Sequence, residues 1–233
     1  MPSNESPKIT HVIFDMDGLL LDTETQYEKA IGNVVGAYGH EYPFELKRKI
    51  MGRKATEGIQ IIVDTLQLPI TYEQYSELVD AEYRKVFSQY IPLMPGAERL
   101  VRHLSAKGVP IAVATSSKGF TFNLKTKPHQ ELFSLFHHIL IASEDPEIVA
   151  GKPHPQTFLV AAARFDEGNR PTDMSRVLVF EDSVAGVQAA NAAGMRSVWV
   201  PDPRMPRDAV VAYQTLDSLE QFKPEEYGLP AYD

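Results

Sequence analysis

The sequence predicts an α/β fold in which a parallel sheet carries helices on both faces, together with an inserted α-helical domain. Short apolar runs recur along the chain, helical patterns alternate with them, and one long stretch breaks this alternation. Alternating strands and helices favour a parallel sheet, because each strand–helix–strand unit forms a crossover connection. A chain of 233 residues is long enough to bury such a core without disulfides.

Five apolar or β-branched runs have the length and the boundaries of buried strands. They are residues 9–14, 109–114, 138–142, 177–180 and 196–200. Apolar residues at helical spacing lie between these runs, at residues 97–107, 156–165 and 184–193. Gly108 and Gly194 follow two of these segments, as glycines often do where helices end.

The stretch between the first and second strand-like runs contains only helical patterns, at residues 23–38, 44–51, 54–66 and 72–87. It is too long for a simple connection between neighbouring strands. We therefore expect an inserted helical domain at residues 23–93. The main domain would then consist of residues 1–22 and 94–233, with the chain re-entering it near Pro95.

Composition and charge exclude several classes of function. The chain has no cysteine, which excludes disulfides, thiolate metal sites and cysteine nucleophiles. Its net charge of −8 argues against a nucleic-acid partner, although a local basic site could still hold a small anion. No segment has the length of a signal-peptide apolar core or of a membrane span. We expect a cytoplasmic monomer that binds a small molecule and neither nucleic acid nor a membrane.

Two carboxylates follow the first strand-like run directly. Ligands of open parallel sheets bind beyond the carboxyl ends of the strands, and Asp15 and Asp17 stand at such an end, in the pattern D-x-D-G. Both could approach one centre, but a polar turn closed by Gly18 explains the pattern about as well. A calcium loop does not, because a strand precedes it and Gln26 stands where the loop requires Glu.

Polar residues also follow the later strand-like runs. Thr115, Ser116 and Ser117 come after the second run, where their hydroxyl and N–H groups could cap a helix or cradle a phosphate. Lys152 lies in a Gly-Lys-Pro turn ahead of a helix, a place where most lysines are solvated. The acidic pair 181–182 ends the fourth run, and its aspartate could cap the next helix, ligate a metal, or both.

The joint occurrence of these motifs, in this order and at strand ends, resembles the haloacid-dehalogenase superfamily. The resemblance rests on Asp15 with Asp17, on Thr115, on Lys152 and on the acidic pair 181–182, and it covers nearly the whole chain. The stretches THVIFDMDGLLLDTE, LMPGAERL, EDPEIVAGKPHP, LVFED and YGLPAYD look like the eukaryotic pseudouridine-5′-phosphatase group. They look almost as much like plant and fungal glycerol-3-phosphate phosphatases. The resemblance implies a Rossmann-like core with a helical cap.

The resemblance also implies a phosphatase that works through an aspartyl-phosphate. Asp15 would attack phosphorus, and Asp17 would protonate the leaving alkoxide and then take a proton from the hydrolytic water. Thr115 and Lys152 would bind the phosphoryl oxygens.

A magnesium ion would neutralise the charge of the ester and of its anionic nucleophile. The resemblance implies that Asp15, Asp182 and the backbone carbonyl of Asp17 hold this Mg²⁺, while Glu181 binds a metal-bound water. Oxygen ligands with open water positions suit Mg²⁺.

Selectivity must come from the inserted domain, because the core motifs act on the phosphoryl group alone. Segment 51–57 lies between two predicted helices, and Gly52 there would let the backbone approach a ligand closely. Arg53 or Lys54 could bind polar groups of the substrate, or both could simply be solvated. The similarity of MGRKA and IQIIVDTLQLP to the pseudouridine-5′-phosphatase group favours pseudouridine 5′-phosphate, with glycerol 3-phosphate as the rival.

Two further functions stay open. A sugar phosphomutase of the same superfamily carries a histidine twelve residues after the nucleophile, where this chain has Tyr27. A catalytically silent binding module is the other alternative, and the intact motif residues argue against it.

Overall fold

The computed structural model describes residues 8–53 and 55–233, and Lys54 lies outside the described residues. Its strands are β1 (His11–Phe14), β2 (Ile111–Thr115), β3 (His138–Ile141), β4 (Val177–Glu181), β5 (Arg196–Trp199) and β6 (Gln214–Thr215). Its α-helices are α1 (Glu24–Gly36), α2 (Phe44–Ile50), α3 (Ala55–Leu66), α4 (Tyr72–Phe87), α5 (Ala97–Ala106), α6 (Gly119–Thr126), α7 (Gln130–Phe133), α8 (Gln156–Ala163) and α9 (Val184–Ala192).

The strands form one sheet in the order β3-β2-β1-β4-β5-β6, and every neighbouring pair is parallel. This confirms the predicted fold class and the predicted strands, with ends shifted by one or two residues. β1 begins at His11 rather than Ile9, because the Ile9 N–H bonds to the Tyr227 carbonyl outside the sheet. β2 continues to Thr115, which pairs with Ile141.

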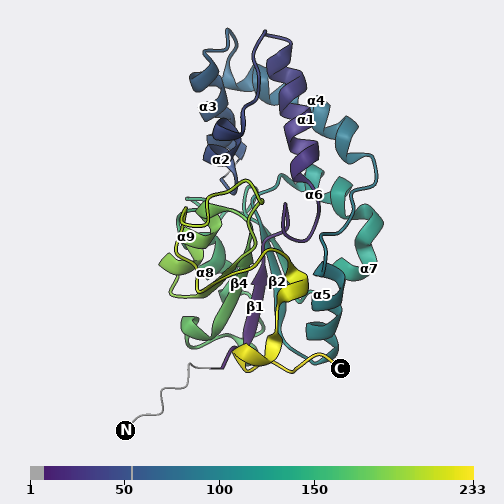
Figure 1. Ribbon diagram of the computed structural model, residues 1–233, viewed down its shortest axis with the longest axis vertical. Helices are drawn as coiled ribbons and strands as arrows, with labels where there is room; N and C mark the ends of the chain where they lie inside the picture. The colour runs from purple at the N-terminus through teal and green to yellow at the C-terminus, as the bar shows by residue number, and fades with distance from the viewer. Residues whose placement is uncertain (1–7, 54) are drawn as a thin grey trace.

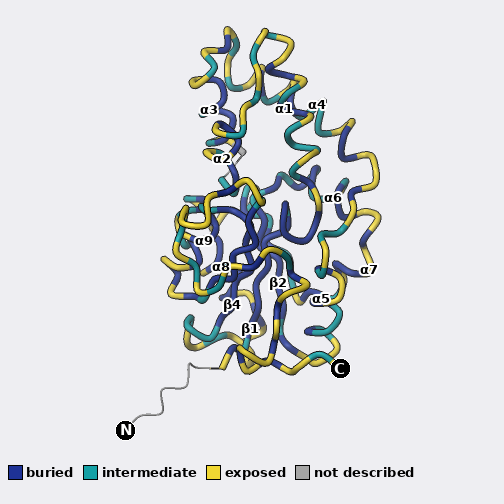
Figure 2. Tube along the Cα trace, in the orientation of Figure 1, coloured by how far each residue is buried: buried dark blue, intermediate teal, exposed yellow. Residues whose placement is uncertain are grey.

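Side chains of successive strand residues point to opposite faces, and helices cover both. Val12 and Phe14 belong to an apolar cluster that includes residues of α5 and α7. Ile13 belongs to a second cluster, built with residues of α8 and α9. Figure 2 shows the strands buried between these two helical layers. This two-sided burial explains why the strands are runs of apolar residues without alternation.

Helices α1 to α4 stand beyond one end of the sheet, at the top of Figure 1. They have an apolar cluster of their own, with Val35, Leu46, Ile62 and Tyr75 among its buried members. The two segments that join them to the sheet run side by side, since a β-bridge pairs Leu21 with Leu93. The expected domain limits, with a cap at residues 23–93, stay a prediction.

Three features of the fold were not predicted from the sequence. Strand β6 has only two residues and both are polar, so no apolar run marks it. Helices α6 and α7 also lack an obvious apolar spacing.

Within the described residues, no helix has both the length and the apolar character that crossing a bilayer requires.

The fold predicts opposite effects for two glycine substitutions. Gly96 precedes α5 with φ +84°, and a Cβ there would lie 2.5 Å from the backbone nitrogen of Glu220. Gly96→Ala should lower the free energy of unfolding by about 2 kcal/mol or more, from left-handed strain and steric overlap. Gly32→Ala should raise it by about 0.5–1 kcal/mol, because the site lies within α1 and a Cβ meets no atom within 4 Å. Urea unfolding measures both, and equal stabilities would contradict this account.

Candidate active site

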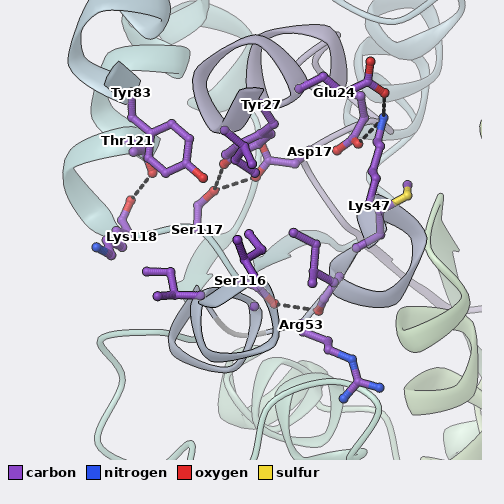
Figure 3. A pocket seen from close by; sticks show the side chains of 18 of the residues that line it. Asp17, Glu24, Tyr27, Lys47, Arg53, Tyr83, Ser116, Ser117, Lys118 and Thr121 are labelled. Atoms are coloured by element: carbon purple, nitrogen blue, oxygen red, sulfur yellow. Dashed lines mark hydrogen bonds and ion pairs between the residues drawn. The ribbon is translucent and has the colours of Figure 1, made fainter. Parts of the chain in front are cut away.

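A cleft lies between the carboxyl ends of the strands and the inserted helices, and it encloses about 980 Å³ of empty space, part of it open to solvent. Asp15, Asp17 and Asp182 line its core end. Tyrosines and isoleucines of α1, α3 and α4 line much of the rest. Figure 3 shows Asp17, Tyr27 and Ser117 gathered on one side of the cleft.

Asp15 is held by a buried lysine. The Lys152 ammonium donates hydrogen bonds to Asp15 Oδ1 at 2.5 Å, to Glu181 Oε1 at 2.6 Å and to the Ala114 carbonyl at 3.2 Å. Lys152 and Glu181 are fully buried, and Asp15 is 6% exposed. Lysine 152 is therefore not the solvated residue that a Gly-Lys-Pro turn alone would suggest.

Glu181 ends β4, and Asp182 leads from it into the cap of α9. Glu181 Oε2 accepts hydrogen bonds from the backbone N–H and the hydroxyl of Ser183, and the Ser183 hydroxyl accepts one from the Gly186 N–H. The indole of Trp199 donates to the Asp182 carbonyl at 2.8 Å. Glu181 is therefore held through its side chain, and Asp182 through its backbone carbonyl.

Asp15, Glu181 and Asp182 form an acid cluster: one carboxylate oxygen from each lies within 4.8 Å of the others. All three residues are buried. Lys152 is the cation that pairs with Asp15 and Glu181. Over residues 8–53 and 55–233, no ion pair is found for the Asp182 carboxylate. The cluster therefore carries more negative than positive charge.

Burial is the main cause of the shifted pKa values of the two aspartates in the cluster, and the neighbouring negative charges add to it. Burial raises the pKa of Asp15 to about 7; Lys152 opposes this rise, and the charges of Glu181 and Asp17 add to it. Burial, followed by the charges of Glu181 and Glu24, raises the pKa of Asp182 well above its usual range. Burial alone would lower the pKa of Lys152, but the carboxylates of Asp15 and Glu181 outweigh it and raise that pKa. Three acids around one ammonium form a site that favours a further cation.

Asp17 turns its carboxylate toward the loop after β2. Its Oδ2 accepts hydrogen bonds from the Ser117 hydroxyl at 2.5 Å and from the Thr115 hydroxyl at 3.4 Å. The Ser117 N–H donates to the Thr115 hydroxyl, so this loop folds back on itself. Asp17 keeps 17% of its side chain exposed and lines the cleft.

A second buried lysine reaches Asp17, and the sequence reasoning missed it. Lys125 lies on α6, is fully buried, and donates to Asp17 Oδ1 at 2.6 Å. It follows Thr115 by ten residues in a helix with no marked apolar face. The sequence around it has no motif that distinguishes it from a solvated lysine.

The loop between α2 and α3 closes on the core. The Ser116 hydroxyl donates to the Gly52 carbonyl at 3.2 Å, and a Cβ on Gly52 would overlap the Ser183 side chain. Glycine 52 therefore permits a close approach to the core loops. The Arg53 guanidinium donates to the Lys49 carbonyl and pairs with Glu57 at 3.6 Å, and it points away from Asp17 and Ser117 in Figure 3.

A charged network on the opposite wall of the cleft was also missed. Lys47 of α2 is 2% exposed and pairs with Glu24 at 2.9 Å, with Glu28 at 2.6 Å and with Asp202 at 3.6 Å. Asp202 follows β5, so this network joins the inserted helices to the core. Arg204 pairs with Glu28 and with Asp202 at 2.6 Å each.

The structure thus brings the predicted core residues to one end of the cleft, at the carboxyl ends of the central strands. These are Asp15, Asp17, Thr115, Ser116, Ser117, Lys152, Glu181 and Asp182. Arg53 lies further out on the cleft wall. The chemical role of each residue stays a prediction.

Comparison with known proteins agrees with this arrangement. The sequence model of the haloacid dehalogenase-like hydrolases matches residues 9–194. A probable pseudouridine-5′-phosphatase of Drosophila melanogaster is 49% identical over 97% of this chain and 96% of its own length. The (DL)-glycerol-3-phosphatase 1, mitochondrial, of Arabidopsis thaliana is 47% identical over 96% of this chain and 75% of its own.

Solved structures share the fold. The crystal structure of CbbY from Rhodobacter sphaeroides in complex with phosphate superposes with a TM-score of 0.73 and 22% identity, over 91% of this chain and 96% of that chain. The family match spans most of the chain, from β1 to the end of α9, and the curated relatives named above are phosphatases. The chain therefore belongs to the haloacid dehalogenase-like hydrolase family and is an enzyme of the phosphatase type.

Proposed function

We propose that the enzyme hydrolyses phosphate monoesters through an aspartyl-phosphate on Asp15, with Mg²⁺ as its cofactor and pseudouridine 5′-phosphate as its best substrate. One observation supports the proposed role of Asp15. The Asp15 carboxylate is buried at the core end of the cleft, 2.5 Å from the Lys152 ammonium and beside Asp182. A carboxylate held in this way is oriented to attack an atom in the cleft.

The residues present fit a divalent cation. The acid cluster supplies oxygen ligands only, and its negative charge exceeds the charge of Lys152. Carboxylate oxygens suit Mg²⁺ better than softer metals. We propose that Asp15, Asp182 and the Asp17 carbonyl hold it. When bound, it would neutralise charge on the phosphoryl oxygens.

The protein's own groups would then carry the proton and the phosphoryl group. Asp15 forms the new bond to phosphorus while the bond from phosphorus to the ester oxygen breaks. Asp17 gives its proton to that oxygen and later removes one from the water that hydrolyses the aspartyl-phosphate. Lys152 and the hydroxyl of Thr115 stabilise the phosphoryl oxygens.

Glu181 has a different environment from the other two acids of the cluster. Its two oxygens already accept hydrogen bonds, from Lys152 on one side and from Ser183 on the other. We propose that Glu181 acts chiefly by holding Lys152 in place. A role with a metal-bound water stays a prediction.

The far wall of the cleft favours an uncharged, planar group on the substrate. It is lined by Tyr42, Tyr75 and Tyr83 and by four isoleucines, Ile31, Ile50, Ile59 and Ile62. Among the described residues that line it, the three cationic side chains have acidic partners: Lys47 with Glu24, Arg53 with Glu57 and Lys118 with Asp80. Aromatic walls stack well on a nucleobase, whereas glycerol would leave most of the apolar surface unfilled.

The Tyr75 hydroxyl offers a way to recognise one edge of a base. Tyr75 lines the cleft, is fully buried, and its hydroxyl has no hydrogen-bond partner within the described residues. An unpaired buried hydroxyl costs free energy that a ligand could recover. Pseudouridine carries a ring N–H that uridine lacks, and we propose that Tyr75 contributes to telling them apart.

Specific observations bear on two alternative activities. Glycerol-3-phosphatase activity is named for a relative at 47% identity, and it is the main rival. Phosphomutase activity fits less well, because Tyr27 stands at the position of the phosphomutase histidine. The Tyr27 hydroxyl accepts a hydrogen bond from Lys125 at 2.9 Å, and burial raises the pKa of Tyr27 well above its usual range. A cytoplasmic, monomeric enzyme without a nucleic-acid partner remains our expectation.

The first test concerns the metal. Mg²⁺ should activate phosphate release from an aryl phosphate, and Ca²⁺ should inhibit it, because calcium takes more oxygen ligands at longer distances and could engage both oxygens of Asp15. Asp182→Asn should weaken activation by Mg²⁺ by about 10-fold or more. Full activity after exhaustive chelation would contradict the proposal.

The second test uses pH and needs no turnover. In the metal-free protein the Asp15 pKa of about 7 lies above its ordinary value of 3.8, so the folded state holds a proton that the unfolded chain releases. The stabilising contribution is complete below pH 4 and is lost as pH rises to 7, on the order of 1–4 kcal/mol. Urea unfolding at several pH values gives the free energy of unfolding of wild type and of Asp15→Asn. The difference between the two isolates the dependence on pH that comes from Asp15. A difference that grows with pH would refute it.

The third test concerns the substrate. The ratio kcat/KM for pseudouridine 5′-phosphate should exceed those for uridine 5′-phosphate and glycerol 3-phosphate by at least about 10-fold. Tyr75→Phe keeps the ring and removes the hydroxyl, and it should reduce the preference over uridine 5′-phosphate about three- to tenfold. Asp15→Asn, checked for deamidation by mass spectrometry, excludes a contaminating phosphatase. A clear preference for glycerol 3-phosphate would overturn the substrate and leave the mechanism intact.

A further inference from the structure

Lys125 is a buried cation that the proposed mechanism does not use. It lies on α6 and is fully buried, although it belongs to none of the sequence motifs that mark the site. Burial lowers the pKa of Lys125, while the charge of Asp17 opposes that shift. A lysine in such a place destabilises the fold unless its ammonium is well paired. Its partners therefore indicate why it is there.

The three N–H groups of the Lys125 ammonium have three acceptors. They are Asp17 Oδ1 at 2.6 Å, the Ser117 hydroxyl at 2.6 Å and the Tyr27 hydroxyl at 2.9 Å. The same ammonium lies 5.1 Å from the ring centroids of Tyr27 and of Phe87. An ammonium has three donors, so this one is saturated by protein groups.

These contacts hold the Asp17 carboxylate at both of its oxygens. Lys125 binds Oδ1, and the Ser117 hydroxyl, which itself accepts from Lys125, donates to Oδ2 at 2.5 Å. A carboxylate bonded at both oxygens cannot rotate freely about its Cβ–Cγ bond. The part of Asp17 that remains accessible lines the cleft.

We propose that Lys125 is the positioning residue for Asp17, holding the carboxylate against Ser117 and tying it to Tyr27 of α1. The inference rests on the proposed role of Asp17 as the group that gives a proton to the leaving oxygen. Among the described residues, the hydrogen bonds of the Lys125 ammonium go to Asp17, Ser117 and Tyr27 and not to the acid cluster. Lys125 acts through Asp17, because it sets the distance between the Asp17 carboxylate and the leaving oxygen of the proposed substrate.

A comparison of leaving groups tests this role. An alkyl phosphate needs the proton from Asp17, whereas 4-nitrophenyl phosphate has a leaving group that departs without one. Lys125→Met keeps the length of the side chain and removes the ammonium. Its kcat should fall about 100-fold on glycerol 3-phosphate or pseudouridine 5′-phosphate, and at most about 5-fold on 4-nitrophenyl phosphate, with little change in KM. Lys127→Met, two residues away at an exposed position, should leave both unchanged.

A double-mutant cycle separates positioning from general damage. In an Asp17→Asn background, Lys125→Met should cost little further activity on the alkyl ester, because both changes remove the same step. Equal losses on the two ester types, or losses that multiply in the double variant, would overturn the inference. If Asp17→Asn itself does not distinguish the esters, the proposed role of Asp17 fails; if it does and Lys125→Met does not, only the role of Lys125 fails.

A second variant keeps the test decisive if Lys125→Met does not fold, as judged by circular dichroism. Tyr27→Phe keeps the ring under the ammonium and removes one of its three acceptors. It should lower kcat on the alkyl ester several-fold more than on 4-nitrophenyl phosphate. Equal effects on both esters would count against the tie between Tyr27, Lys125 and Asp17.

Discussion

The buried ammonium of Lys152 is the contact on which the core end of the cleft depends. It joins three strand ends, because it donates to Asp15 after β1, to the Ala114 carbonyl in β2 and to Glu181 at the end of β4. Removing the ammonium would leave the two buried carboxylates without their ion-pair partner, which costs about 3–5 kcal/mol or forces them to take up protons. Stability and the orientation of Asp15 are therefore set by one side chain.

Even with the Lys152 ammonium in place, the site has an excess of negative charge. Four carboxylates, of Asp15, Asp17, Glu181 and Asp182, face two ammonium groups, and Lys125 serves Asp17 alone among the acids. A phosphate monoester brings further negative charge, and in a partly desolvated cleft the repulsion would be large. This arrangement favours an additional cation beside the carboxylates, which is the physical basis for the proposed Mg²⁺.

The core of the site could be predicted because its residues end apolar strands. Runs such as 9–14 and 177–180 stop abruptly at acids, and the carboxyl ends of parallel strands meet at one edge. Lys125 could not be found in this way, because its burial depends on α1 and α4 packing against α6 through Tyr27 and Phe87. Strand β6 was missed for a related reason: its two polar residues pair with β5 through the backbone alone.

The helix α1 connects the proposed selectivity to the proposed chemistry. Its Tyr27 accepts a hydrogen bond from Lys125 beside Asp17, and one turn further along Ile31 lines the apolar wall of the cleft. On its other flank Glu24 and Glu28 hold Lys47, which also pairs with Asp202 of the core. A group that fills the cleft therefore touches the helix that helps fix Asp17. Because one helix carries both sets of contacts, we expect the fit of the proposed substrate and the position of Asp17 to be coupled, so that a tighter or looser wall at Ile31 alters both.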